Sequence, residues 1–348
     1  MNPKNKTHKK NTKEKFLSLS VVMATFNSAR TVARSLKSIR EQDYPQEKIE
    51  IIIADGGSKD KTLEIVKKFH VKVIHVPPKL QGAEYNKGTG VNAAKNEILF
   101  MLDSDNILPH KQWFRKMIVP FLENKDVVGV EPLRFHYDPK MTLLDRYFAL
   151  LGGSDPVAYY FGKDSHLSYA FDSYNLFGKS RDMGEYYLVK FNKNKVPALG
   201  GNGAAMRREL LLKEAHADPD HFFHIDVNVD LIRKGFNTYG LFKDSIIHLT
   251  NNKVIPFLLR RRFYIEKYHF EDLSKRRYSI YEPKKDRGNL IKYIILSITF
   301  VKPLYDSFRG FLKIHDVAWF IHPFMCFTML IVYGVPTIKE EVKRVFKA

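Results

Sequence analysis

Short apolar runs alternate with amphipathic segments along the first part of the chain. The apolar runs are residues 17–24, 49–54, 71–76 and 98–102, each of a length and composition typical of a β-strand. Between the first two runs, Val32, Leu36 and Ile39 recur at the spacing of one helix face. A repeated β-α order of this kind predicts a largely parallel, Rossmann-like α/β sheet with right-handed crossovers and helices on both faces.

Residues with oxygen-bearing side chains close several of these apolar runs. Thr25 and Asn27 come at the end of the first run, Asp55 at the end of the second, and Asp103 at the end of the fourth. In a parallel sheet, ligands bind in the crevice outside the carboxyl ends of the strands. We therefore expect these four residues to face a single crevice.

The sequence Asp103-Ser104-Asp105 ends the run of five apolar residues at positions 98–102. Strand residues two apart point to the same side, so both carboxylates are expected to leave the strand end together. Two adjacent carboxylates repel each other, and a hard divalent cation such as Mg²⁺ or Mn²⁺ relieves that repulsion through oxygen ligands. The tripeptide alone is also typical of a solvated turn, so the decision depends on its context.

Four segments taken together resemble the family 2 glycosyltransferases in order and spacing. They are residues 20–27 (Ser-Val-Val-Met-Ala-Thr-Phe-Asn), residues 54–62 (Ala-Asp-Gly-Gly-Ser-Lys-Asp-Lys-Thr), the helix carrying Asn86, Gly88 and Ala94, and residues 102–105 (Leu-Asp-Ser-Asp). The resemblance covers roughly the first 250 residues. It implies a GT-A fold and the inverting transfer of a sugar from a nucleotide donor, a UDP-sugar in preference to a GDP-sugar.

The resemblance also implies roles for individual residues. Asp55 is expected to face the base, Thr25, Asn27 and Asn86 to line the nucleotide pocket, and Asp103 and Asp105 to hold the ribose and the metal diphosphate. Two positions depart from the family pattern. Gly56 stands where a second acidic residue is frequent, and Tyr85 stands where an arginine is usual. The second departure removes a cation that is a candidate contact of the diphosphate.

A glycine-rich segment at residues 197–204 contains Gly201, Asn202 and Gly203. In the resembling family, such a segment lies under the donor sugar and the acceptor, where glycine permits close approach of the backbone to a ligand. We expect a helix over residues 205–212 to follow it. Without the resemblance, the same residues are equally typical of a plain turn.

Inverting transfer requires a base that removes the proton of the acceptor hydroxyl. The Glu-Asp pair usual in the family is absent, and His224-Ile-Asp226 stands in that region. We favour Asp226, because the family's base is a carboxylate, and His224 is its rival because imidazole is a competent base near neutral pH. The resemblance further implies that His248 completes the metal shell, against the alternative of a surface histidine after a strand.

The composition of the chain indicates which kinds of partner it binds. The 348 residues include 57 Lys and Arg against 38 Asp and Glu, a net charge of +19 that predicts anionic partners. Cys326 is the single cysteine, which excludes an internal disulfide and a cysteine-based metal site. Residues 1–15 contain six lysines and no apolar stretch, and we expect a disordered basic tail there rather than a signal peptide.

The composition changes after residue 250, so we expect a GT-A domain over residues 16–250 and a helical, membrane-associated region over residues 251–348. Basic clusters interleaved with tyrosines are followed by an interfacial or core helix at residues 290–301. Residues 317–338 contain no charged side chain and are long enough to span a bilayer or form a re-entrant helix. We expect this region to bind the cytoplasmic face of an anionic membrane. We expect no binding of nucleic acid, because no nucleic-acid-binding motif accompanies the basic clusters.

The leading hypothesis is a metal-dependent glycosyltransferase that moves a sugar to an acceptor hydroxyl on a polyprenyl lipid or a growing glycan. One alternative is a sugar-nucleotide pyrophosphorylase, although the glycine-rich phosphate loop it requires is missing from residues 25–28. The other is an inactive nucleotide-sugar-binding scaffold at the membrane, suggested by the missing Glu-Asp pair.

Overall fold

The computed structural model describes residues 16–174, 178–250, 253–266, 275–279 and 281–347. The expected basic tail at residues 1–15 lies outside the described residues. Within those residues, ten strands form one sheet in the order β3-β2-β1-β4-β9-β6-β10-β8-β7, with β5 paired to β10. The strands are β1 (Leu19–Thr25), β2 (Ile49–Asp55), β3 (Lys72–His75), β4 (Ile98–Met101), β5 (Asn106–Ile107), β6 (Val127–Phe135), β7 (Lys179–Asp182), β8 (Tyr186–Lys190), β9 (Ala204–Arg207) and β10 (Thr238–His248).

The four strands expected from the apolar runs are present and parallel. β1 pairs with β2 and with β4, and β2 pairs with β3, in each case in the same direction. Their carboxyl ends therefore meet along one edge of the sheet, as the sequence predicts.

The sheet as a whole is mixed, which corrects the prediction of a largely parallel one. β9 runs antiparallel to both β4 and β6, and β8 runs antiparallel to β10 and β7. β9 occupies the start of the segment expected to be a helix over residues 205–212, where the helix α8 (Arg208–Glu214) begins only after the strand. The reason is a tertiary one, because β9 fills the gap between two parallel strands and completes their hydrogen bonds.

Alternate residues of the central strands feed two separate hydrophobic clusters, one on each face of the sheet. In β1, Leu19, Val21 and Met23 belong to the cluster with α1, α2 and α4, whereas Val22 belongs to the cluster with α3, α8 and α9. This is the period of two that a strand buried on both faces requires. The helices of this part are α1 (Val32–Arg40), α2 (Thr62–Val66), α3 (Ala83–Ala93), α4 (Trp113–Met117), α5 (Val119–Glu123), α6 (Leu143–Leu151), α7 (Pro156–Phe161), α8 (Arg208–Glu214) and α9 (His224–Arg233).

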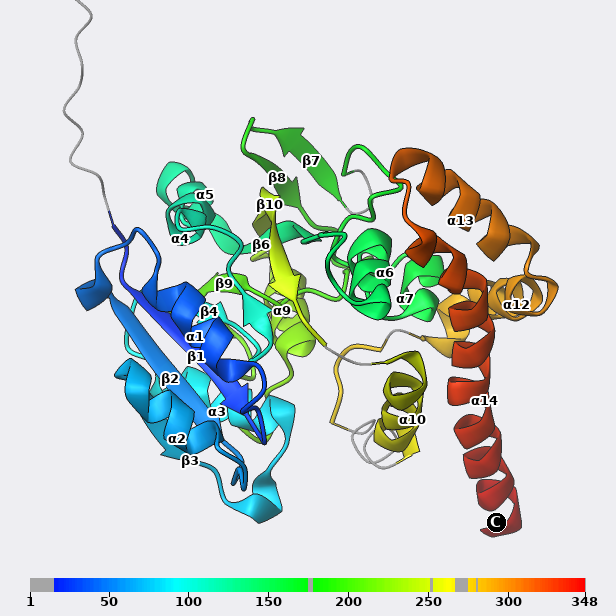
Figure 1. The fold of residues 1–348 in the computed structure, drawn as a ribbon, viewed down its shortest axis with the longest axis horizontal. Coiled ribbons are helices and arrows are strands. Elements are labelled where there is room, and N and C mark those ends of the chain that lie inside the picture. Colours follow the sequence, from blue (N-terminus) through cyan, green and yellow to red (C-terminus); the bar gives the residue numbers. More distant parts are fainter. Residues whose placement is uncertain (1–15, 175–177, 251–252, 267–274, 280, 348) are drawn as a thin grey trace, which may run out of the picture.

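A group of C-terminal helices packs beside the sheet, and most of it lies on the side of the molecule away from β1, β2 and β3 (Figure 1). It comprises α10 (Val254–Tyr264), α12 (Pro283–Thr299), α13 (Val301–Lys313), the short 3₁₀ helix η5 (Val317–Ile321) and α14 (His322–Lys347). A third hydrophobic cluster joins these helices to α6, with Leu144 and Phe148 on one side and Trp319 and Met329 on the other. The expected helix at residues 290–301 corresponds to the second half of the longer helix α12, which ends at Thr299, and Val301 already begins α13. Short 3₁₀ helices η1 (Gln46–Lys48), η2 (Lys67–Phe69) and η3 (Pro78–Leu80) connect the first strands.

Candidate active site

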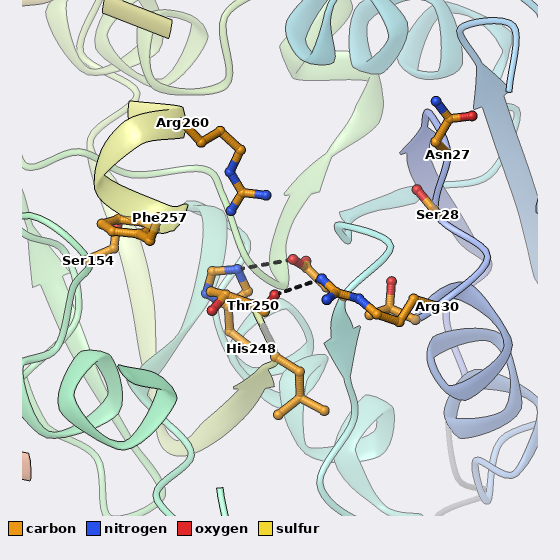
Figure 2. A pocket seen from close by; sticks show the side chains of 11 residues that line it. Asn27, Ser28, Arg30, Ser154, His248, Thr250, Phe257 and Arg260 are labelled. Carbon is orange, nitrogen blue, oxygen red and sulfur yellow. Dashed lines mark hydrogen bonds and ion pairs between the residues drawn. The ribbon is translucent and has the colours of Figure 1, made fainter. Parts of the chain in front are cut away.

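A cavity of about 280 Å³ opens at the carboxyl ends of the central strands. It is lined by Asn27 after β1, Asp105 after β4, His248 at the end of β10, and Phe257 and Arg260 from α10. Figure 2 shows Arg260 extending toward His248 from one side, while Arg30 reaches across from the other side and donates a hydrogen bond to the Thr250 carbonyl at 3.0 Å. The cavity therefore combines carboxylate, imidazole and guanidinium groups at the edge where ligands of parallel sheets bind.

Asp105 and His248 come together because of strand register. The two-residue strand β5 pairs antiparallel with β10 so that Asn106 lies opposite His248. The Asp105 Oδ2 and His248 Nε2 atoms are consequently 3.5 Å apart. Burial works to lower the pKa of His248, but the Asp105 carboxylate, together with the charges of Asp103 and Asp145, raises it. Burial works to raise the pKa of Asp105, but the facing His248 imidazole, together with a backbone hydrogen bond and the Lys87 charge, lowers it.

This pair also provides the test of whether a divalent cation fits. A carboxylate oxygen and an imidazole nitrogen are both donors that Mn²⁺ accepts. Among the described residues, no group of three or more His, Cys, Asp or Glu side chains is arranged to hold a metal ion. Asp105 and His248 therefore fit an ion that takes its remaining ligands from a diphosphate and water.

Asp103 points to a different partner, the ammonium group of Lys87 on α3. The Lys87 Nζ atom lies 2.9 Å from Asp103 Oδ1 and 3.9 Å from Glu84 Oε1. Burial works to lower the pKa of Lys87, but the Asp103 and Glu84 carboxylates raise it. Glu84 in turn accepts from the His224 ring at 2.8 Å and from the His224 backbone N–H at 2.8 Å. A continuous chain of charged groups thus connects the strand end to the start of α9.

Sequence reasoning missed Glu84, Lys87, Arg30 and Arg260. A cation was expected to be lacking because Tyr85 stands where the resembling family has arginine. Lys87, two residues further along α3, is buried and supplies positive charge to the same strand end. Arg260 was interpreted as part of a basic surface segment, and its position on the cavity wall depends on how α10 packs.

Replacing Lys87 with Met is expected to lower the free energy of unfolding by about 3 kcal/mol, because it leaves two carboxylates near one another without their shared cation. Urea denaturation followed by circular dichroism measures this loss. Lys37→Met is the matched control, since Lys37 makes a solvent-exposed pair with Glu41 at 3.7 Å, and we expect it to change stability by less than about 0.5 kcal/mol. Equal effects of both substitutions would contradict the assigned role of Lys87.

Thr25, Asn27 and Asp55 do lie together, and they organise the turn after β2. Asp55 is fully buried and accepts hydrogen bonds from the Thr25 hydroxyl at 2.8 Å and from the Ser58 hydroxyl at 2.6 Å. It also accepts from two backbone N–H groups, those of Gly57 and Ser58. Asn27, in the left-handed region at φ 51°, accepts from the Lys59 N–H at 2.8 Å. These contacts fix the loop that forms one wall of the crevice.

Asn86 is buried in α3 and faces the same turn. In the amide orientation that satisfies both ends, its nitrogen donates to the Gly82 carbonyl at 3.1 Å and its oxygen accepts from the Gly56 N–H at 3.3 Å. A side chain on Gly56 would collide with Gln81 and Asn86. The acidic residue that is frequent at this position in the family therefore has no room here. This explains why a glycine stands at position 56.

The glycine-rich segment bridges the Asp105 loop and His224. Asn202 has φ 49° and its side-chain oxygen accepts from the Asn106 amide at 3.1 Å. Gly201 lies against the His224 ring, since a Cβ on Gly201 would meet Nε2 at 3.4 Å. Gly203 lies against Trp113. The expected neighbours Gly201, Asn202 and Gly203 thus lie between the candidate metal ligands and one candidate base.

Asp226 is oriented away from this role. It has no exposed surface, and its two oxygens accept hydrogen bonds from the Arg276 guanidinium at 2.9 to 3.1 Å. The backbone N–H of Arg277 donates to the same carboxylate at 2.6 Å. This arrangement is typical of a buried structural ion pair. His224, by contrast, keeps part of its ring exposed, so the geometry favours the rival over the residue preferred from sequence.

Glu131 lies beneath the glycine-rich segment and is fully buried. Its carboxylate accepts from the Gly200 N–H. Burial raises its pKa from the usual 4.5 to about 8, although the hydrogen bonds from Gly200 and Ser165 work in the opposite direction. Glu131 is therefore neutral at pH 7, and it carries a proton in the folded state that it lacks in the unfolded state.

Because the folded-state pKa of Glu131 is raised, its protonation stabilises the fold fully below about pH 4.5, and that contribution is lost as the pH rises toward 8. We expect the melting temperature to fall by a few degrees over this range through Glu131. Glu131→Gln is expected to flatten the profile, because the amide keeps the acceptor and does not titrate. Thermal unfolding measured at intervals across the range, with Glu64→Gln as an exposed control, tests this. An unchanged profile in Glu131→Gln would contradict it.

Comparison with known proteins identifies relatives of this arrangement. The profile of the family Glycosyl transferase family 2 matches residues 20–213, more than half of the chain. Glycosyltransferase AglE of Haloferax volcanii is 30% identical over 134 residues, which are 37% of this chain and 43% of that protein. The poly(ribitol-phosphate) beta-N-acetylglucosaminyltransferase TarS of Staphylococcus aureus is 28% identical over 96 residues, 26% of this chain and 17% of that protein. The matched segment thus spans less than half the length of these curated relatives.

The fold is shared with a solved structure, the mannosyltransferase PcManGT from Pyrobaculum calidifontis in complex with GDP-Man and Mn²⁺. The two chains superpose with a TM-score of 0.52 over 93% of this chain and 88% of that one, at 16% sequence identity. The α/β GT-A fold with C-terminal helices is therefore shown, with the sheet mixed rather than largely parallel.

Proposed function

The chain belongs to glycosyl transferase family 2, and from this membership we propose that it transfers a sugar from a nucleoside-diphosphate donor to an acceptor hydroxyl with inversion at the anomeric carbon. The observation that carries the proposal is the Asp105–His248 pair at 3.5 Å, held at the carboxyl edge of the sheet, where Asn106 donates a hydrogen bond to Asn202 of the glycine-rich segment. The family match supports the reaction class, and the cavity supports the position of the diphosphate.

Asp105 and His248 are the residues that we propose to hold a divalent cation, Mn²⁺ or Mg²⁺. Such an ion, when bound, supplies positive charge to the oxygens of the departing diphosphate. Arg260 and Arg30 line the same cavity and provide further positive charge for those oxygens. Asp103 remains a proposed partner of the ribose, with Lys87 fixing its position. Thr25, Asn27, Asp55 and Asn86 shape the nucleotide pocket in this proposal.

His224 is the base that we propose on the basis of its contacts. Its Nδ1 atom lies 2.8 Å from Glu84, which favours the tautomer with the proton on Nδ1 and leaves the Nε2 lone pair available. The Nε2 atom lies beside Gly201, where the acceptor is expected. As the acceptor oxygen bonds to the anomeric carbon and the bond to the diphosphate breaks, Nε2 takes the hydroxyl proton. In this proposal Asp226 has a structural role, because its ion pair with Arg276 holds that arginine against α9.

For the nucleotide of the donor and for the acceptor, we propose a class of molecule and not a single compound. One relative is named as an N-acetylglucosaminyltransferase and the solved mannosyltransferase was captured with GDP-Man, so UDP-sugars and GDP-sugars both belong in the test. We propose an acceptor carried on a polyprenyl lipid or a growing glycan. Its support is that α10 contributes Phe257 and Arg260 to the cavity while exposing Ile255 and Leu259 beside it.

The purified full chain incubated with Mn²⁺ and a panel of UDP- and GDP-sugars tests the proposal. We expect release of UDP or GDP from one donor class, with slow hydrolysis even before an acceptor is found. Release of pyrophosphate from a nucleoside triphosphate and a sugar phosphate would instead indicate a pyrophosphorylase. Nucleotide binding with neither activity would favour the scaffold alternative.

A further inference from the structure

The helix α13 buries two polar side chains, those of Asp306 and Ser307, while it exposes most of its apolar ones and its basic ones. Asp306, Ser307 and Gly310 are buried against the rest of the protein, where Asp306 accepts a hydrogen bond from the Tyr160 hydroxyl at 2.8 Å. The exposed side chains are Val301, Leu304, Tyr305, Phe308 and Leu312, and Leu312 is 75% exposed. A helix on the surface of a water-soluble protein normally shows the opposite pattern, with apolar side chains buried and polar ones exposed.

The helix α12 repeats this arrangement. Ser297 has no exposed surface and Asp286 is buried, where it forms an ion pair with Lys163 at 3.2 Å. Ile291, Ile295 and Ile298, at the spacing of one helix face, are each at least half exposed. Burying polar groups while exposing isoleucine costs free energy in water, so an apolar surrounding for this face is favoured.

The segment Val317–Glu340, which comprises η5 and most of α14, is apolar and long enough to cross a membrane, with a mean hydropathy of 1.6. One side of α14 nevertheless packs against the rest of the protein. His322 is buried and lies 2.7 Å from the Tyr147 hydroxyl and 3.0 Å from the Tyr160 hydroxyl, and Met325 and Met329 have no exposed surface. A helix surrounded by lipid has no such polar contacts to a globular domain, so only its outer side is available to a membrane.

That outer side is continuous with the exposed side chains of α13. Phe308 of α13 packs against Phe320 of η5 at 5.2 Å between ring centroids, and Phe300 packs against Phe327 of α14 at 5.6 Å. Phe324 and Ile331 extend the same outer side along α14. We call the following exposed side chains the apolar face: Ile291, Ile295, Ile298, Val301, Leu304, Phe308, Leu312, Phe320, Phe324, Phe327 and Ile331.

We propose that the apolar face is inserted into one leaflet of an anionic membrane, with α12, α13 and α14 lying in the interface rather than spanning it. Charge complementarity selects a membrane over a protein partner as the occupant. Exposed cations stand on the same helices, at Lys284, Lys285, Arg287, Lys292 and Lys313, in a chain of net charge +19. Helices with an apolar side and basic flanks bind in this manner to anionic lipid headgroups.

This position brings the candidate active site to the membrane surface. The helix α10 contacts α14, exposes Ile255 and Leu259, and contributes Phe257 and Arg260 to the cavity wall. An acceptor anchored in the leaflet reaches the cavity along α10 without leaving the membrane. The membrane attachment itself does not depend on the proposed reaction.

Flotation of the purified full chain with preformed vesicles tests the proposal. We expect binding to phosphatidylcholine vesicles that contain phosphatidylglycerol, weaker binding to phosphatidylcholine alone, and partial release by salt. The double substitution Phe308→Asp and Leu312→Asp is expected to reduce the bound fraction about tenfold or more. Leu80→Asp and Leu122→Asp form the matched control, because both side chains are 38% exposed and lie outside the C-terminal helices.

Failure of the full chain to float, or equal flotation of the two double variants, would overturn the proposal. The proposal would also be overturned if the wild-type chain formed an oligomer and bound no vesicles, and if the Phe308→Asp and Leu312→Asp double variant were monomeric.

The orientation of the helices is measured with a fluorophore attached to Phe324→Cys or Ile331→Cys in a Cys326→Ala chain. Lipids that carry quenchers at known depths report how deeply each position is inserted. We expect equal, shallow depths, and a deep position at Ile331 alone would indicate a spanning helix. Nucleotide release measured without vesicles in the same variants separates this proposal from the proposed reaction.

Discussion

Replacing Asp105 with Asn is expected to reduce turnover of the sugar nucleotide by about a thousandfold. The substitution preserves shape but removes the charge that faces His248 at 3.5 Å, and with it one of the two protein groups available to a divalent cation. Nucleotide release at saturating Mn²⁺ measures the loss. Raising the Mn²⁺ concentration is expected to restore part of the rate, because the defect is in metal affinity.

Asp43→Asn is the control for this substitution. Asp43 forms a surface ion pair with Arg115 at 3.1 Å, remote from the cavity, and its loss is expected to leave turnover unchanged. His248→Ala is expected to reproduce the effect of Asp105→Asn without adding to it, since the two act as one site. A wild-type rate in Asp105→Asn would contradict the assignment of the metal site.

His224→Ala is expected to lower kcat by about a hundredfold to ten-thousandfold, with little change in the KM for the donor, because it removes the group that takes the acceptor proton. The protein is expected to remain folded. Glu84→Gln is expected to retain part of the rate, because a glutamine oxygen still accepts a hydrogen bond from His224 Nδ1 and holds the ring in place.

Asp226→Asn distinguishes the two candidate bases. Because it leaves Arg276 beside α9 without its charged partner, we expect a loss of about 3 to 5 kcal/mol in the free energy of unfolding. Below its melting temperature the variant is expected to keep much of its activity. A stable Asp226→Asn protein without transferase activity, together with an active His224→Ala protein, would reverse the assignment.

The first four strands were predictable because burial on both faces leaves a plain pattern of apolar runs. The same pattern placed Thr25, Asn27, Asp55 and Asp103 at one edge, since the ends of parallel strands coincide. β9 was not predictable from local sequence. Residues 204–207 have weak strand character, and they become a strand because two parallel neighbours offer unpaired backbone groups.

Partners distant in sequence explain what was missed in the site. Arg276 is 50 residues from Asp226, and Asp226 resembles a free acidic residue until the two are brought together. Lys87 is similar, because nothing in its local sequence tells whether α3 turns it toward Asp103 or toward solvent. The sequence supplied candidate groups, and packing decided which of them are engaged elsewhere. The exposed apolar side of α13 was likewise visible only once burial was known.

The most direct test of the account is calorimetric titration of the full chain with UDP and with GDP, each with and without Mn²⁺, repeated with Asp105→Asn. We predict that one of the two nucleotides binds, that Mn²⁺ strengthens its binding at least tenfold, and that the substitution abolishes this gain. Absence of binding by both nucleotides in the presence of Mn²⁺ would contradict the assignment of a nucleotide-sugar site to this cavity.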